Sequence, residues 1–300
     1  MTGVANLGGL LQAEWLRLRR RPEVLLLAAL IPIAAGLLFI ASFLDAIRQV
    51  GVGDGPLTTI PPEFLYWMAW LREPYAFPQS LLTVLSGAWP IPLACLFLGT
   101  ATVGADFGWG TIRTALLAWG DRTGWLLARV LSLAAVAALL LAAVLVVGTL
   151  LPLVLVVAGE HLPAVDPPTG LLVVIGAHLL VAIQYAVLGV VSGLVARSLA
   201  GGFLLAGGYL LFETSVAGLG VWSASGLRAV PAFSFSGSGR TLIEAANRVS
   251  GAPPPLDPNA AAFLPPPALP GWLSLVVVLV WLGALAALAL LRLRRLDVTE

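Results

Sequence analysis

Six stretches of the chain are almost wholly apolar and are each about 20 residues or longer, the length that an α-helix needs to cross a bilayer. They are 24–44, 80–103, 130–158, 170–196, 199–222 and 271–291. The composition agrees, because 59% of the 300 residues are hydrophobic and only 10% are charged, whereas soluble domains are about one quarter charged. The sequence therefore predicts an all-α integral membrane protein with six transmembrane helices, forming one domain over residues 1–300.

The residue types that the chain lacks exclude several kinds of site. It contains no lysine, so the phosphate-binding loop that ends in Gly-Lys-Ser/Thr cannot form. A single cysteine, Cys95, excludes a disulfide within the chain, and two histidines are too few for a His/Cys metal site. No Ser/His/Asp set or HExxH motif is present. We therefore expect no catalytic residue, no metal and no cofactor in this chain, and no nucleic acid among its partners.

The placement of arginine predicts the orientation, because cytoplasmic segments carry an excess of basic residues. The two ends of the chain and the connections 104–129 and 197–198 hold eleven arginines, whereas the longer connections 45–79 and 223–270 hold five. Both termini are therefore expected in the cytoplasm, and 45–79 and 223–270 outside. Within the second of these, 240–249 is expected to form a short helix near the outer surface.

The connection 104–129 is expected to contain a short helix between two sharp breaks. A Gly-Trp-Gly sequence ends the second apolar run, and Thr111 can cap a new helix. Gly120 then stops that helix, and Asp121 can cap the third transmembrane helix. The spacing i, i+3, i+4, i+7 predicts one apolar face. The residues on this face are Ile112, Ala115, Leu116 and Trp119.

Two interpretations of this connection remain open. A positively charged loop can serve only to fix the topology, but a bare topology loop needs no amphipathic helix with a cap at each end. Arg113 stands off the apolar face, within reach of Asp106 or of a carboxylate on a partner protein. A second amphipathic helix is predicted in segment 1–23, lying in the membrane interface before the first span. Its apolar stripe consists of Leu7, Leu10, Leu11, Trp15 and Leu18.

The arrangement resembles the ATP-binding-cassette type-2 permeases, the membrane subunits of many bacterial exporters. That family's motif is an acidic residue before Gly-Thr-x-Arg, then paired leucines, an arginine, and a basic residue opening the third span. The corresponding residues are Asp106, Gly110-Thr111-Ile112-Arg113, Leu116-Leu117, Arg122 and Arg129. The chain departs from the family in having Asp for the usual Glu, and Gly120-Asp121 where a proline turn is common.

The resemblance implies that the helix in 104–129 is a coupling helix, which docks in a groove of a separate ATPase subunit. The residues implied in ATPase coupling are Asp106, Thr111, Ile112, Arg113, Leu116, Leu117, Trp119 and Arg122. The implied assembly in the lipid bilayer holds two copies of that ATPase and a second permease copy, as a homodimer or a heterodimer. ATP and magnesium would then bind in the ATPase, and this chain would not itself be an enzyme. The implied location is the cytoplasmic membrane of a bacterium or archaeon.

Polar residues inside the apolar runs are candidates for a pathway or gate, since burying a charge in a bilayer is costly. Glu213 is one such residue, with a bridged or protonated structural glutamate as the alternative. His178, Tyr185 and Ser192 recur every seven residues and share one helix face, with Gln184 beside it. This face fits either hydrogen bonding between helices or a substrate path. Small residues in the fifth run predict close helix packing. They are Gly201, Gly202, Ala206, Gly207 and Gly208.

The sequence thus favours the transmembrane subunit of an ATP-driven exporter, which forms the translocation pathway. One alternative is a secondary transporter driven by an ion gradient, although such proteins usually show repeated halves and several charges at mid-membrane. A second alternative is a membrane assembly subunit that transports nothing. The sequence does not indicate the transported substrate.

Overall fold

The structure is a computed structural model, and it describes residues 7–20, 22–50, 75–77, 79–86, 88–108, 110–112, 122–157, 170–217, 230–250 and 269–295. Within these ranges every regular element is helical. The helices are α1 Leu7–Arg19, α2 Pro22–Val50, α4 Ser80–Ser86, α5 Pro90–Gly108, α7 Arg122–Val157, α8 Leu171–Ala196, α9 Leu199–Ala217, the 3-10 turn η4 Val230–Phe233, α11 Phe235–Val249 and α13 Gly271–Arg294.

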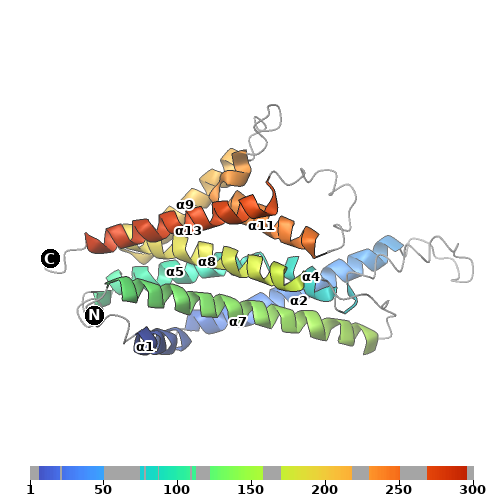
Figure 1. Cartoon of the computed structure of the whole chain (residues 1–300). Coiled ribbons are helices and arrows are strands. Elements are labelled where there is room, and N and C mark those ends of the chain that lie inside the picture. Colours follow the sequence, from blue (N-terminus) through green and yellow to red (C-terminus); the bar gives the residue numbers. More distant parts are fainter. Residues whose placement is uncertain are drawn as a thin grey trace, which may run out of the picture.

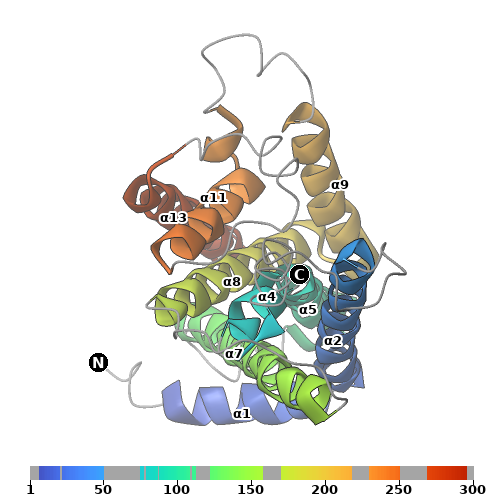
Figure 2. The same cartoon turned by 90° about the vertical axis from the view of Figure 1, so that its right-hand side faces the viewer.

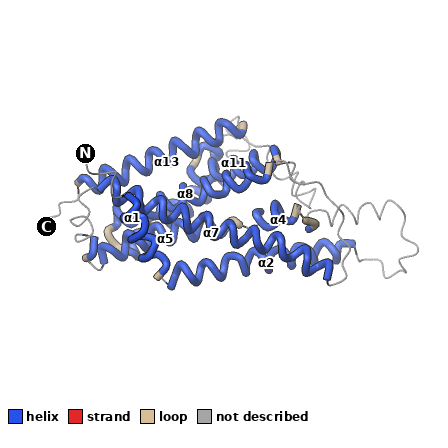
Figure 3. The backbone as a smooth tube through the Cα atoms, turned by 60° about the horizontal axis from the view of Figure 1, so that its bottom comes forward, coloured by secondary structure: helices blue, strands red, loops and turns tan. Residues whose placement is uncertain are grey.

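Six of the described helices are long and apolar enough to cross a membrane, which confirms the predicted number. They are α2, through Val24–Asp45, together with α5, α7, α8, α9 and α13. The long helices run in roughly the same direction as one elongated bundle, and α1 and the last turn of α13 lie at the same end of it (Figures 1 and 3). The chain is therefore built as a multi-pass membrane protein.

The expected second run, 80–103, contains two helices instead of one. Helix α4 ends at Ser86, and α5 starts afresh at Pro90 and continues to Gly108. Proline is favoured at the first position of a helix because it has no N–H to donate there. The 19 residues of α5 span about 28 Å at 1.5 Å each. Because the residues on both sides of this break are apolar, the run of apolar residues in the sequence did not indicate where α4 ends and α5 begins.

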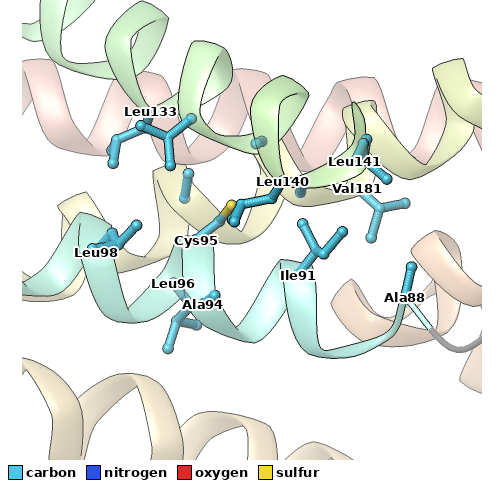
Figure 4. Close-up of a cluster of buried hydrophobic side chains, with 14 of the residues drawn as sticks. Ala88, Ile91, Ala94, Cys95, Leu96, Leu98, Leu133, Leu140, Leu141 and Val181 are labelled. Carbon is cyan, nitrogen blue, oxygen red and sulfur yellow. The ribbon is translucent and has the colours of Figure 1, made fainter. Parts of the chain in front are cut away.

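Helix α5 lies at the centre of the bundle. Its side chains Ile91, Cys95 and Leu98 are buried, and they lie among residues of α7 and α8 such as Leu140 and Val181 (Figure 4). Cys95 is a free thiol in this apolar contact. Helices α2, α7, α8 and α9 therefore contact α5, whereas α13 packs on the side of α8 away from α5 (Figure 2).

Glycines bring the backbones of α5 and α8 into close contact. A Cβ atom on Gly99 would overlap the carbonyl oxygen of Ala186, and one on Gly189 would overlap that of Leu96. Gly193 follows Gly189 by four residues and also faces α5, in the small-xxx-small spacing of closely packed membrane helices. The predicted contact surface on α9 is smaller than expected. Gly202 and Ala206 are buried, but a Cβ on Gly207 or Gly208 would meet nothing within 4 Å.

Helix α1 does not run along the bundle. Viewed down the bundle axis in Figure 2, α1 lies crosswise beneath α7, whereas the long helices point toward the viewer. This is the orientation that an interfacial helix would adopt, although its place in a membrane stays a prediction. We call the end of the bundle that holds α1 the basic end and the other the far end. The described arginines at the basic end include Arg17, Arg122, Arg197 and Arg292.

Candidate functional site

Four charged side chains form one network at the basic end. Arg129 of α7 donates through Nη2 to Asp106 Oδ2 of α5 at 3.0 Å and to Glu14 Oε1 of α1 at 2.9 Å. Its Nη1 donates to the carbonyl oxygen of Thr102 at 2.8 Å. Arg17 of α1 completes the network through a bidentate pair with Asp106. The network therefore joins α5 and α7 to α1, through contacts between residues 89 or more positions apart in the sequence.

The network is almost fully removed from solvent. The side chains of Asp106 and Arg129 are 0% exposed and that of Glu14 is 3% exposed, whereas Arg17 is 31% exposed. The guanidinium of Arg129 also lies 4.7 Å from the centre of the buried Trp125 ring, in a cation–π contact. With two carboxylates and two guanidiniums the network has no formal net charge, so each buried charge has an opposite partner that offsets part of its desolvation cost.

The described start of the following connection is tied to the same network. Gly110 has φ of +68°, the left-handed conformation that glycine adopts easily, so the predicted glycine break is confirmed. The hydroxyl of Thr111 donates to the carbonyl and side-chain oxygens of Asp106, each at 3.4 Å. Ile112 is helical and half-buried.

The rest of the connection, 113–121, lies outside the described residues. It includes four of the residues implied in coupling, whose expected helix and contacts stay predictions. They are Arg113, Leu116, Leu117 and Trp119. The expected pairing of Arg113 with Asp106 is likewise untested, but both carboxylate oxygens of Asp106 are already engaged by Arg17 and Arg129.

The other flank of the connection is attached to the last helix of the chain. Arg122, the first residue of α7, donates through Nη1 to the carbonyl oxygens of Leu293 at 2.6 Å and Arg294 at 3.1 Å. These carbonyls belong to the last turn of α13, where no helical N–H is left to bond them and the helix dipole is negative. Arg122 therefore caps α13 and holds its end against the start of α7.

A second polar cluster surrounds the first residues of α11. Glu213 of α9 accepts hydrogen bonds through Oε1 from the backbone N–H of Ser236 at 2.7 Å and from its hydroxyl at 3.0 Å. Ser236 is the second residue of α11, so Glu213 caps this helix from another element. The cap also places a carboxylate at the positive end of the helix dipole. Glu213 is one of three buried residues on α9.

Helix α11 runs along α8 and starts near the middle of the bundle. At one end, Gln184 of α8 donates to the carbonyl oxygen of Phe235 at 3.2 Å. At the other, a Cβ atom on Gly170 would lie 2.7 Å from the Cα atom of Ser250. Gln184 is the fourteenth of the 26 residues of α8, about 20 Å from its first residue at 1.5 Å per residue.

The helix expected over 240–249 therefore starts five residues earlier, at Phe235, and its first turn lies deep between the transmembrane helices. The glycines at 237 and 239 obscured this first turn in the sequence, because they weaken a helical pattern. Here they allow close contact instead, since a Cβ atom on Gly239 would lie 3.1 Å from Val181 of α8.

Aromatic rings cover the buried first turn of α11. The ring of Phe235 lies 5.0 Å from that of Tyr185, 6.1 Å from that of Tyr209 and 5.9 Å from that of Trp281 of α13, measured between centroids. The indole N–H of Trp281 donates to the carbonyl oxygen of Phe233 at 3.0 Å. Helices α8, α9 and α13 thus all contact the first turn of α11.

The face of His178, Tyr185 and Ser192 does not form one site. His178 is buried, and its Nδ1 lies 2.9 Å from the carbonyl oxygen of Val174 in its own helix. Ser192 is buried toward the basic end, next to the glycine contact with α5. Tyr185 packs on Phe235 beside the Glu213 cap. Tyr185 and Glu213 therefore share a cluster, and the other two residues lie elsewhere on α8.

Several site residues were not singled out as functional candidates from the sequence. The signal for Glu14 was present, because it lies four residues from both Leu10 and Leu18 and so interrupts the apolar stripe of α1. Arg17 was counted only toward the topology. Ser236 and Trp281 gave no signal, since a serine in a loop and a tryptophan in a span are common in membrane proteins.

Comparison of the chain with profiles of protein families, with curated proteins and with solved structures finds no match in any of the three. Within the described residues, no group of three or more His, Cys, Asp or Glu side chains is arranged to hold a metal ion.

Proposed function

We propose that this protein is the transmembrane subunit of an ATP-driven exporter, with the organisation of the ATP-binding-cassette type-2 permeases. In this proposal two copies of the chain, or this chain and a related one, form the translocation pathway and bind two copies of a separate ATPase. The connection between α5 and α7 docks on the ATPase and transmits its motion to the membrane helices. ATP and magnesium bind to the partner.

The observation that carries the proposal is the attachment of both flanks of this connection. On one side, Asp106 and Thr111 belong to the buried network with α1 and α7. On the other side, Arg122 is bonded to the end of α13. A displacement of the connection would therefore act on three transmembrane helices and on α1 together. A loop that only fixed the topology would need its charges in water, whereas Asp106 and Arg129 are buried.

The orientation is tested by labelling introduced cysteines with a thiol reagent that cannot cross membranes. In intact cells, cysteine at Gly55 or Asp257 should react, and cysteine at Ala118 or Val298 should react only after the membrane is opened. The native Cys95 is buried and gives a low background. Labelling at position 118 in intact cells would place the connection outside and would contradict the proposal.

The coupling role is tested with the variant Leu116→Asp, which puts a charge on the predicted apolar face of the connection. Full burial of a leucine side chain contributes about 1.5–3 kcal/mol, so the partner ATPase should be lost from the membrane fraction. ATP-driven export should stop, although the permease itself still inserts. Thr114→Asp, off the predicted face, is the matched control. If Leu116→Asp retained ATPase and transport, the connection would be a topology loop.

A further inference from the structure

Helix α13 makes specific polar contacts at two levels of the bundle. Its last turn accepts the hydrogen bonds of Arg122 at the basic end. Trp281 lies twelve residues earlier, about 18 Å away at 1.5 Å per residue, and its indole N–H binds the carbonyl oxygen of Phe233. One helix thus contacts both the flank of the α5–α7 connection and the chain that leads into α11.

The contact between α13 and α11 extends beyond this hydrogen bond. The rings of Trp281 and Phe235 meet edge to face, with an interplanar angle of 84°. Nearer the far end, a Cβ atom on Gly271 would lie 3.1 Å from the Cβ atom of Ala245. Helix α13 thus holds α11 both at Phe235 and at Ala245. A shift of α13 along or about its axis would therefore carry α11 with it.

The opposite side of the first turn of α11 is held by α9, through the cap of Glu213 on Ser236. Helix α9 itself is mostly exposed in the described structure, with Leu204 at 78% and Leu211 at 70% exposure. A movement of α11 with α13 would therefore stretch the cap. The cap is a pair of hydrogen bonds between two elements and can open without unfolding either of them.

We propose that α13 links the α5–α7 connection to the buried first turn of α11, with Arg122 and Trp281 as the positioning residues at its two contacts. Loss of either contact weakens the Glu213 cap. The inference rests on the proposed function, because it assigns α13 as the route by which ATPase docking would open the region around Glu213. Its test needs only the purified permease, so that its failure and the failure of the proposed function are distinguishable.

The test is hydrogen exchange, followed by mass spectrometry, of the amides at 234–238 in the full chain in lipid nanodiscs. Arg122→Gln should raise their exchange rate by about fivefold, the change expected when about one net hydrogen bond is lost from a local equilibrium. Arg19→Gln, which changes an exposed arginine at the basic end, should leave them unchanged. Trp281→Phe keeps an aromatic ring, although a smaller one, and removes the indole N–H. It should give a similar increase, whereas the same change at the exposed Trp272 of α13 should not.

The double variant Arg122→Gln/Trp281→Phe decides whether the two contacts act through one element. On the proposal, its exchange at 234–238 rises no further than in Trp281→Phe alone, because the link is already broken. If Arg122→Gln raises exchange only in the last turn of α13, or if the two effects multiply, the proposal is wrong. Should Arg122→Gln fail to insert, Arg122→Lys retains the charge at the end of α13 without the planar guanidinium. It should then show an increase smaller than that of Trp281→Phe, and an unchanged rate would count against the proposal.

Discussion

The charge network at the basic end should respond to substitution as one unit. In Arg129→Met, the buried Asp106 and Glu14 lose their shared guanidinium and face only Arg17, which is partly exposed. Removing one partner from a buried ion pair typically costs about 3–5 kcal/mol, because the other charge stays buried without compensation. We expect a loss of that size in the free energy of unfolding.

The double variant Asp106→Asn/Arg129→Met removes one charge of each sign and leaves Glu14 with Arg17, whose charged atoms are 3.8 Å apart. Its loss should be smaller than the sum of the two single losses by at least about 1 kcal/mol, as is found for residues in one network. Reversible unfolding in mixed micelles with increasing dodecyl sulfate, followed by circular dichroism, measures the free energy of unfolding of Arg129→Met, Asp106→Asn and the double variant. Arg20→Met, at an exposed site nearby, is the control and should change stability by less than about 0.5 kcal/mol. If the loss in the double variant equalled the sum of the two single losses, Asp106 and Arg129 would not act as one network.

Three further variants test other parts of the fold. Gly189→Val should disrupt the contact between α5 and α8 and lower the thermal stability in detergent by several degrees, whereas Gly176→Val, with open space beside it on the same helix, should not. Glu213→Gln keeps an acceptor for Ser236 but removes the charge from the end of α11, so stability should fall by about 0.3–2 kcal/mol; no change would show that the charge does not contribute. Burial, followed by the negative charge of Asp45, raises the pKa of Tyr75 to about 12. The free energy that the neutral phenol contributes to the folded state should therefore be lost only as the pH rises from 10 toward 12. The absorbance difference between the wild type and Tyr75→Phe should show one tyrosine that ionises above pH 10. Ionisation near pH 10 would contradict this prediction.

The sequence predicted the number of transmembrane helices because each needs a run of apolar residues, and such runs are visible without a structure. It also predicted the glycine break before Thr111, since glycine favours the left-handed backbone at Gly110. The division of the second run at Pro90 was missed, because both halves are apolar. The position of α11 was also missed, since its depth depends on contacts with Gln184 and Trp281 on other helices.

Individual members of the candidate site could be predicted, but their partners could not. Asp106, Arg122 and Arg129 were singled out by the motif of the resembling family, and Glu213 by the cost of a charge in a membrane. Asp106 pairs with Arg129, 23 positions away in the sequence, and Arg122 binds the carbonyl oxygen of Leu293, 171 positions away. Such pairings depend on how the helices pack against one another, so they cannot be predicted from a local pattern in a single sequence.

On the proposed function, the connection between α5 and α7 binds an ATPase subunit. The most direct measurement is photo-crosslinking in living cells from a benzoylphenylalanine placed at Leu116, with the product identified by mass spectrometry. We expect a crosslink to a separate protein that contains a phosphate-binding loop, and none from the same probe placed at Thr114. Crosslinks from position 116 to lipid or to this chain alone, with no ATPase among the products, would contradict it.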